Sequence, residues 1–585
     1  MTSQSESPRP MRSSVVGQRV MSILGLGAAA VALFCAIRHF GMIQFGGMDA
    51  SAFVQAGWRL FLGETPYKDL VTVAHPALFV PPGVAFCVFG CKWSSLVLLT
   101  AIVAVLMLIL HYAVLRLLQW GLVWCFALAM VTQAVTFLPL SSWGHNQATS
   151  VSAAIFVASA CAVLCRPKSI VAAVALVLAT TILSWQKANT AGVLLPAVFL
   201  TLVTSRRTWR STLVCGLLAL VLSAGLLYWA RIDPWVMIQS VLGGSGRITN
   251  LEFYRSCFFG DWYEYVPTYL MLLPILGAWV FCLLSRPKVS FQAPGAKRVL
   301  AVAVIALVTA LWTKATNHDH VMNETPLLLT GILLTIFNPA RLQAQTAQPN
   351  PDAAQGPCPT PASGATEGRA EDAAAAPVVG PAASGGFVSS GSRKRWVRSL
   401  SQAWLLAGIT YVGIWGIAVT AERWRVRTIG AGMFYEDVTL GKPLSAPPFF
   451  EGMIVGPRLA AVLNDISKVL RNPSVVGLTN VSDEELKSSV FFGPRIEFGY
   501  AAFNKIPRRG LLLWWPGTGE MPQEKIDQAV AEFERWNPRL CFFWTTEAGF
   551  VDSTFMPQEL MIFLRDHYRL YVTPSCQVTV LVRNP

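Results

Sequence analysis

The chain has 585 residues, of which 54% are hydrophobic and 13% are charged, and its mean hydropathy is +0.49. This composition places it among polytopic membrane proteins rather than soluble ones. The formal net charge of +14 does not indicate nucleic-acid binding, because the basic residues lie in short clusters between apolar runs, as topogenic charges do.

Eleven apolar runs are long enough to cross a membrane when tilt is allowed. They cover residues 20–40, 95–118, 122–140, 148–165, 170–185, 190–203, 213–230, 266–284, 299–312, 326–337 and 401–420. Arg9, Arg12 and Arg19 precede the first run and no small-residue cleavage site follows it, so we expect a retained helix rather than a cleaved signal peptide.

A twelfth apolar run, residues 77–90, is not expected to span. If it did, the later basic clusters at 206–210 and 286–298 would lie outside, against the positive-inside rule. Pro81, Pro82 and Gly83 also favour a broken helix. We therefore predict an all-α polytopic membrane module with about 11 spans, a cytoplasmic N-terminus and a re-entrant or interfacial hairpin at 77–90.

This topology gathers polar residues on the predicted outer face. Five pieces of chain reach that face: 41–92, 141–147, 186–189, 233–265 and 314–325. Because polar groups collected at one face of a membrane bundle mark where substrate binds, the site is expected there.

The C-terminal part changes character. Residues 343–398 are mostly rich in Ala, Pro, Gly and Ser, which predicts a disordered cytoplasmic linker. The linker joins a membrane module at 20–342 to a last span at 399–421. A tail at 1–19 precedes the membrane module. Residues 422–585 alternate strand and helix patterns, which predicts an extracytoplasmic α/β domain. Expected helices cover 457–470, 522–536 and 557–566, and expected strands cover 474–478, 510–514, 540–544 and 577–582.

Two cysteines of this domain, Cys541 and Cys576, lie in or next to candidate strands. An oxidising compartment permits a disulfide between them, although nothing in the sequence fixes its geometry. Two aromatic segments, 491–498 and 514–517, fit either the domain core or an acceptor-binding surface.

Asp49 is the first carboxylate after the first predicted span. It is either a solvated or helix-capping acid at the membrane edge, or a general base whose pKa is raised by an apolar, partly dry surface. Lys187 lies between two apolar runs on the outer side, where it either snorkels or binds a donor phosphate. Arg247 and Arg255 in the long outer loop suit the same phosphate role.

Histidines of the outer turns complete the set of candidates. His318 and His320 flank an Asp, but their spacing without further ligands is poor for zinc, so no metal site is predicted. They lie either in a solvated loop or in contact with donor or acceptor. The remaining candidates for substrate contact are Arg59, His75 and His145.

The outer motifs resemble those of the GT-C superfamily of polyprenyl-phosphate-sugar glycosyltransferases, such as aminoarabinose transferases and protein mannosyltransferases. The resemblance rests on Gly47-Met48-Asp49, the amphipathic stretch with residues 63–66, His75-Pro76, and the turns at 142–146 and 185–190, and it covers about half the chain. It implies an extracytoplasmic site, a lipid-linked donor and a catalytic Asp in the first outer loop, which is Asp49 here.

The chain also departs from that pattern. Many relatives carry two neighbouring acids in the first loop, whereas Met48 and Ala50 flank Asp49, so a divalent metal is not favoured and no cofactor is expected. Aminoarabinose transferases have Lys-Pro where this chain has His75-Pro76, which weakens a phosphate contact from His75.

The resemblance implies transfer of a sugar from a polyprenyl-phosphate donor to an extracytoplasmic acceptor hydroxyl on a lipid, glycan or protein, with inversion and with Asp49 as base. Membrane lipids are the expected partners, nucleic acid is not, and the expected location is the plasma (inner) membrane. The alternative is a lipid or glycan flippase or transporter without transfer chemistry. That class predicts ionisable residues at mid-membrane depth and internal repeats, and no repeat is found.

Overall fold

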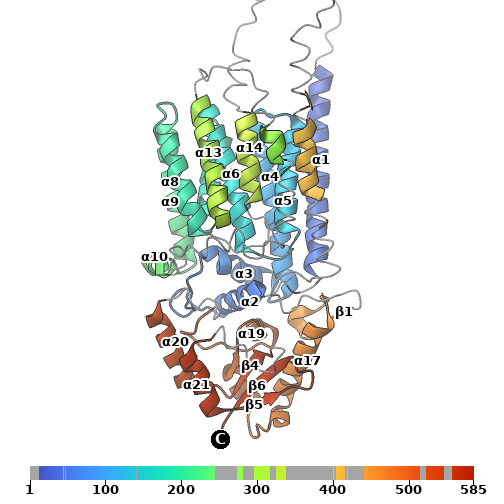
Figure 1. The fold of residues 1–585 in the computed structure, drawn as a ribbon, viewed down its shortest axis with the longest axis vertical. Coiled ribbons are helices and arrows are strands. Elements are labelled where there is room, and N and C mark those ends of the chain that lie inside the picture. Colours follow the sequence, from blue (N-terminus) through green and yellow to red (C-terminus); the bar gives the residue numbers. More distant parts are fainter. Residues whose placement is uncertain are drawn as a thin grey trace, which may run out of the picture.

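The computed structural model describes residues 12–43, 45, 48–139, 141–243, 273, 275–280, 295–315, 324–337, 399–400, 403–414, 418, 441–513, 522–545 and 556–585. A bundle of long helices forms one part, and a small domain of helices and strands stands on one end of the bundle (Figure 1). Residues 12–19 of the predicted tail are the start of α1 (Arg12–Gly41), whereas residues 1–11 and the predicted linker lie outside the described residues. The division into five regions stays a prediction.

The bundle helices coincide with predicted spans. They are α1 (Arg12–Gly41), α4 (Trp93–Leu117), α5 (Leu122–Phe137), α6 (His145–Cys165), α7 (Ile170–Ser184), α8 (Ala188–Val203), α9 (Trp209–Trp229), α13 (Ala296–Ala315) and α14 (Thr325–Ile336). Five described helices are long and apolar enough to cross a membrane, and α5, α7, α8 and α14 are shorter apolar helices. The predicted span at 266–284 falls mostly outside the described residues, and Ala403–Ile414 forms an apolar helix within the last one.

Successive bundle helices run in opposite directions, so the predicted outer pieces gather at one end. The starts of α4, α6, α8 and α14 all lie at the end that carries the C-terminal domain, and α10 (Pro234–Gly243) lies there too (Figure 1). The basic turns 166–168 and 204–208 lie at the opposite end. The described parts of the predicted outer pieces therefore share one end of the bundle, as expected, whereas residues 244–265 and 316–323 lie outside the described part.

Two helices, α2 (Met48–Phe61) and α3 (Pro76–Phe89), lie between the bundle and the C-terminal domain (Figure 1). They pack closely because glycines stand where they meet. A Cβ on Gly57 would lie 2.8 Å from the Cβ of Pro82, and one on Gly83 would lie 2.9 Å from the Cβ of Leu60. Residues 77–89 therefore lie between the bundle and the C-terminal domain and not within the bundle, which agrees with the prediction that they do not span.

The prediction of a broken helix at 77–90 was wrong, since α3 is continuous through Pro81 and Pro82. Proline has no N–H for the carbonyl four residues earlier. The Ala77 carbonyl, which Pro81 leaves without that bond, instead accepts the indole N–H of Trp143 at 3.0 Å. The Ala77 N–H donates to the Trp185 carbonyl at 3.2 Å. A bond from a distant turn thus compensates for the proline.

The C-terminal domain is an α/β layer, as predicted. Its sheet has the order β3-β4-β6-β5, with β3 parallel to β4 and the other pairs antiparallel. The strands are β3 (Val490–Phe492), β4 (Leu540–Trp544), β5 (Tyr568–Val572) and β6 (Val578–Arg583), and the main helices are α17 (Pro457–Arg471), α20 (Gln523–Trp536) and α21 (Gln558–His567).

Side chains that alternate along the strands build two cores, one on each face of the sheet. Phe542 and Val580 pack with residues of α17, whereas Phe543 and Leu581 pack with residues of α20 and α21. Helices therefore cover both faces, which explains why β4 is a continuous apolar run rather than an alternating one.

Two strand predictions were wrong, and two strands of the four-stranded sheet were missed. Residues 474–478 contain a 3₁₀ helix (Pro473–Val476) that ends at Gly477 in a left-handed conformation. Residues 510–513 join no strand of the sheet and instead pair with the loop after α2: Leu513 N–H donates to the Val71 carbonyl at 2.9 Å. The strands β3 and β5 were not predicted. Both cysteines are free, Cys541 buried and Cys576 exposed.

The exposed thiol of Cys576 offers a test of sidedness. In right-side-out membrane vesicles we expect an impermeant maleimide to label wild-type protein at Cys576, because the C-terminal domain is predicted to be extracytoplasmic. A Cys576→Ser variant should lose that label. Adding Lys168→Cys, an exposed position in the turn between α6 and α7, should restore no label until the membrane is permeabilised. Labelling of Lys168→Cys in sealed vesicles would contradict the predicted topology.

Candidate functional site

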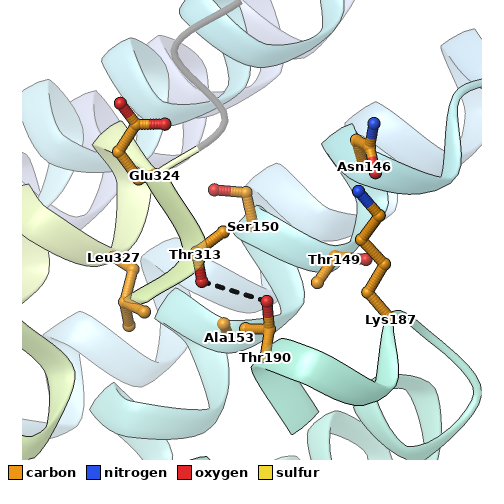
Figure 2. Close-up of a pocket in the computed structure, with 9 residues that line it drawn as sticks. All are labelled: Asn146, Thr149, Ser150, Ala153, Lys187, Thr190, Thr313, Glu324 and Leu327. Atoms are coloured by element: carbon orange, nitrogen blue, oxygen red, sulfur yellow. Dashed lines mark hydrogen bonds between the residues drawn. The ribbon is translucent and has the colours of Figure 1, made fainter. Parts of the chain in front are cut away.

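A polar pocket lies at the domain-facing end of the bundle. Four elements contribute to it: the start of α6, the turn between α7 and α8, the end of α13 and the start of α14 (Figure 2). The pocket is small and partly open to solvent. Its lining residues are Asn146, Thr149, Ser150, Ala153, Lys187, Thr190, Thr313, Glu324 and Leu327.

Lys187 enters the pocket from the turn before α8, where its backbone caps the helix. The turn is fixed to α6 because the buried amide of Gln186 accepts a hydrogen bond from Thr149 Oγ1 at 3.1 Å. Figure 2 shows the Lys187 side chain extending towards Asn146. The structure therefore places a lysine predicted to bind phosphate in a pocket at the domain-facing end of the bundle.

Hydroxyl groups from α6, α8 and α13 also line the pocket. Thr190 Oγ1 and Thr313 Oγ1 share a hydrogen bond of 3.0 Å that joins α8 to α13 (Figure 2). The Ser150 hydroxyl is buried and has no hydrogen-bond partner among the described residues. A buried hydroxyl of this kind requires a partner, which a water or a polar ligand in the pocket would supply.

Glu324 brings an acidic group to the same pocket. It caps α14 and its side chain is largely buried, 9% exposed for the residue. The sequence analysis did not single it out. The available signal was its place at the end of the outer piece 314–325, directly before an apolar run. That signal is weak, because a carboxylate at the start of a helix is usually interpreted only as a cap.

His75 is the residue that supports the Lys187 turn. Its Nε2 accepts the backbone N–H of Ala188 at 3.2 Å, which requires that nitrogen to be unprotonated. Burial, together with the neighbouring Lys187 ammonium, lowers the pKa of His75 to about 4. At neutral pH the ring is therefore uncharged, and it contributes a hydrogen bond rather than a positive charge.

Arg59 is fully buried and bonded to protein groups. Its Nε lies 2.5 Å from Glu64 Oε2, and its Nη atoms donate to the carbonyls of Asp69 at 2.5 Å and Leu511 at 3.2 Å. Burial raises the pKa of Glu64, although the Arg59 charge acts in the opposite direction. The guanidinium thus joins α2 to the C-terminal domain, and no substrate contact is proposed for it.

The other candidates are placed by backbone only or not at all. Asp49 lies in the first turn of α2 and His145 begins α6, next to the pocket residue Asn146, but their side chains lie outside the described part. Outside it altogether are Arg247, Arg255, His318 and His320. Among the side chains that are described, no three His, Cys, Asp or Glu residues gather as a metal site would require.

The fold is that of a polytopic membrane protein with a small α/β domain at one end of its helical bundle, and a pocket lined mainly by polar residues lies at that end. The chain is similar to a solved structure of ArnT from Cupriavidus metallidurans bound to undecaprenyl phosphate: 12% identity, 96% of this chain and 99% of that one, TM-score 0.45. It is also similar to ArnT in the apo state, with 12% identity, 98% and 100% coverage, and a TM-score of 0.44.

No protein-family model matches the chain, and no curated protein does. Because both structural similarities have TM-scores below 0.5, the function is argued from the chain's own residues.

Proposed function

We propose that this protein is a GT-C-type membrane glycosyltransferase that moves a sugar from a polyprenyl-phosphate donor to an acceptor hydroxyl outside the membrane. The observation that carries the proposal is the position of Lys187, in a pocket at the end of the helical bundle. A polyprenyl phosphate has its phosphate at the membrane edge and its chain in the bilayer, so its charged group reaches the level of this pocket.

The phosphate is the group that Lys187 would bind. As the glycosidic bond breaks, the departing polyprenyl phosphate gains negative charge, and an ammonium beside it stabilises that charge. Arg247 and Arg255 are further candidates for the same phosphate, since a guanidinium binds it through two N–H groups at once. The uncharged His75 holds the turn that carries Lys187.

The acceptor hydroxyl requires a base on the other side of the sugar. Asp49, in the first turn of α2 at the same end of the bundle, is proposed to take the acceptor proton while the oxygen attacks the anomeric carbon. The sugar–phosphate bond breaks in the same displacement, so the configuration inverts. His145, His318 and His320 remain candidates for contacts to donor or acceptor.

One observation favours the flippase or transporter alternative. His111 on α4 is buried in the bundle, where its Nδ1 lies 3.2 Å from Thr132 Oγ1. An ionisable residue within a span is a feature that transporters use. A single buried histidine with a threonine partner is also a common packing arrangement, so the alternative is left to the experiment.

The test uses purified protein in nanodiscs with a synthetic short-chain polyprenyl-phosphate sugar. Released polyprenyl phosphate measures transfer to an acceptor or to water. Movement of the donor across proteoliposome membranes without such release would favour the flippase instead.

In the same assay, Lys187→Ala is expected to raise KM for the donor and also to lower kcat, because the phosphate is charged in both the ground state and the transition state. A hydrogen bond to a charged group contributes ~1.5–3 kcal/mol, so kcat/KM should fall by ~10- to 150-fold. Lys168→Ala, at the opposite end of the bundle, is the matched control. Unchanged donor binding in Lys187→Ala would contradict the phosphate role.

A further inference from the structure

A buried carboxyl group of the C-terminal domain contacts α2 beside the proposed base. Glu497 is 1% exposed and lies between β3 and the short helix α19 (Gly499–Ala502). Its Oε2 accepts the hydroxyl of Ser51 at 2.6 Å, and the Ser51 oxygen accepts the Phe498 N–H at 3.0 Å. Ser51 stands two residues after Asp49, so both bonds attach the first turn of α2 to one loop of the domain.

That loop is itself firmly held. Arg495 adopts a left-handed conformation with φ 75°, which a residue with a side chain occupies only when its surroundings enforce it. A Cβ on Gly499 would lie 2.4 Å from the ring of Phe492, so α19 rests directly on β3. The Phe498 ring packs on Phe45 with centroids 5.1 Å apart. The carboxyl of Glu497 is therefore presented to α2 from a fixed position.

The rest of α2 has its own attachments to the domain. Trp58 Nε1 donates to the Lys505 carbonyl at 2.8 Å, and Arg59 donates to the Leu511 carbonyl. Both lie near the C-terminal end of the helix. Loss of the Glu497 contact should consequently release the first turn of α2 while the helix stays docked.

We propose that Glu497 is a positioning residue: through Ser51 it fixes the α2 turn that carries Asp49, so the C-terminal domain sets the geometry of the proposed base. The inference rests on the proposed function. Because a misplacement of ~1 Å can cost ~10² in rate, an anchor of this kind has a measurable effect on catalysis without touching substrate.

The raised pKa of Glu497 provides a second, independent test of its role. Burial raises the pKa of Glu497 to about 7, while the bond from Ser51, nearby backbone N–H groups and the Arg495 charge act in the opposite direction. Arg495 and Tyr500 are the charged and titratable groups described as facing it. Its Oε1 has no hydrogen-bond partner among the described residues.

The sign of the pH effect follows from the raised pKa. The ordinary pKa of this carboxyl is 4.5, and its pKa in the folded protein is about 7. Between these two pH values, the folded protein therefore binds the Glu497 proton more tightly than the unfolded chain does. The stabilisation is therefore complete below about pH 4.5 and is lost as the pH rises through about 7. Glu497→Gln, which keeps a carbonyl acceptor for Ser51 but does not titrate, should remove this dependence.

The experiment compares Glu497→Gln, Glu497→Ala and Ser51→Ala in the full-length protein. The control is Glu451→Gln, which changes an exposed contact between the same two parts, 3.2 Å from Lys92 Nζ. Three quantities are measured: hydrogen–deuterium exchange of residues 48–54, the unfolding temperature from pH 5 to 8.5, and the kcat and KM of transfer.

Glu497→Ala and Ser51→Ala should raise exchange in residues 48–54 and lower kcat by ~10- to 100-fold, with KM for the donor little changed. Glu497→Gln should keep exchange and kcat close to wild type and flatten the fall of unfolding temperature with pH. Unchanged exchange in both alanine variants, or a Gln variant as impaired as Ala, would overturn the proposal. Exchange and unfolding need no substrate, so failure of the transfer reaction itself is recognised separately.

Discussion

Asp49→Asn should lower the turnover of sugar transfer by ~10²–10⁴, the usual contribution of a positioned general base. Asparagine keeps the size and hydrogen-bonding capacity of the side chain but does not accept the acceptor proton. Donor affinity should change little, because the base acts on the acceptor. The measurement is release of polyprenyl phosphate at saturating donor, together with a donor-binding titration.

Two further variants make that result specific. Asp49→Glu should fall between wild type and Asn, because one extra methylene misplaces the carboxylate and errors near ~1 Å can cost ~10² in rate. Asp527→Asn, on the exposed face of α20, is the control for loss of a carboxylate elsewhere. If Asp49→Asn keeps most of the wild-type rate, Asp49 is a capping or solvated acid at the start of α2, the other interpretation that the sequence allowed.

Hydropathy and charge predicted the bundle well because both act over whole segments. A run of about 20 apolar residues must cross the membrane as a helix, and the basic turns fix its direction. The same argument correctly kept residues 77–90 at the interface. It gave the wrong local structure there, since the bond from Trp143 to Ala77 that preserves α3 joins residues 66 positions apart. No local pattern contains that bond.

The C-terminal domain shows the limit of strand prediction. β4 was predicted because it is an apolar run of five residues, and β6 because four of its six residues are apolar. Strand β3 has only three residues and is defined by its parallel partner β4. Residues 510–513 are apolar for another reason, namely that they pair with the loop after α2. An apolar segment indicates burial, but it does not indicate which neighbour provides it.

The sequence predicted at which end of the bundle the candidate site lies, but it did not predict the contacts between the residues of that site. Lys187 was recognised because a lysine between two apolar runs is conspicuous, and the structure places it in the pocket. The neutral state of His75 depends on its burial and on the Lys187 ammonium, and its partner, the Ala188 N–H, is 113 positions away in the chain. Glu324 and Glu497 were overlooked because a helix cap and an acid within an aromatic segment each have an ordinary explanation until their burial is known.

The Arg59–Glu64 pair should be the most destabilising one to break. Glu64→Ala leaves a guanidinium that is 0% exposed without its carboxylate, and removal of one partner of a buried pair typically costs ~3–5 kcal/mol of unfolding free energy. Glu64→Gln should cost less, because its amide oxygen still accepts the Arg59 Nε–H. The free energy of unfolding is measured by denaturant titration in mixed micelles.

Glu451→Ala is the matched control, since its partner Lys92 is 52% exposed and Glu451 is 60% exposed. Water replaces such a contact, so no measurable change is expected. The same Arg59 side chain also donates to Leu511, and Glu64→Ala should therefore loosen the C-terminal domain, seen as faster proteolysis of the interface. If Glu64→Ala costs no more than the control, the carbonyl contacts alone satisfy Arg59.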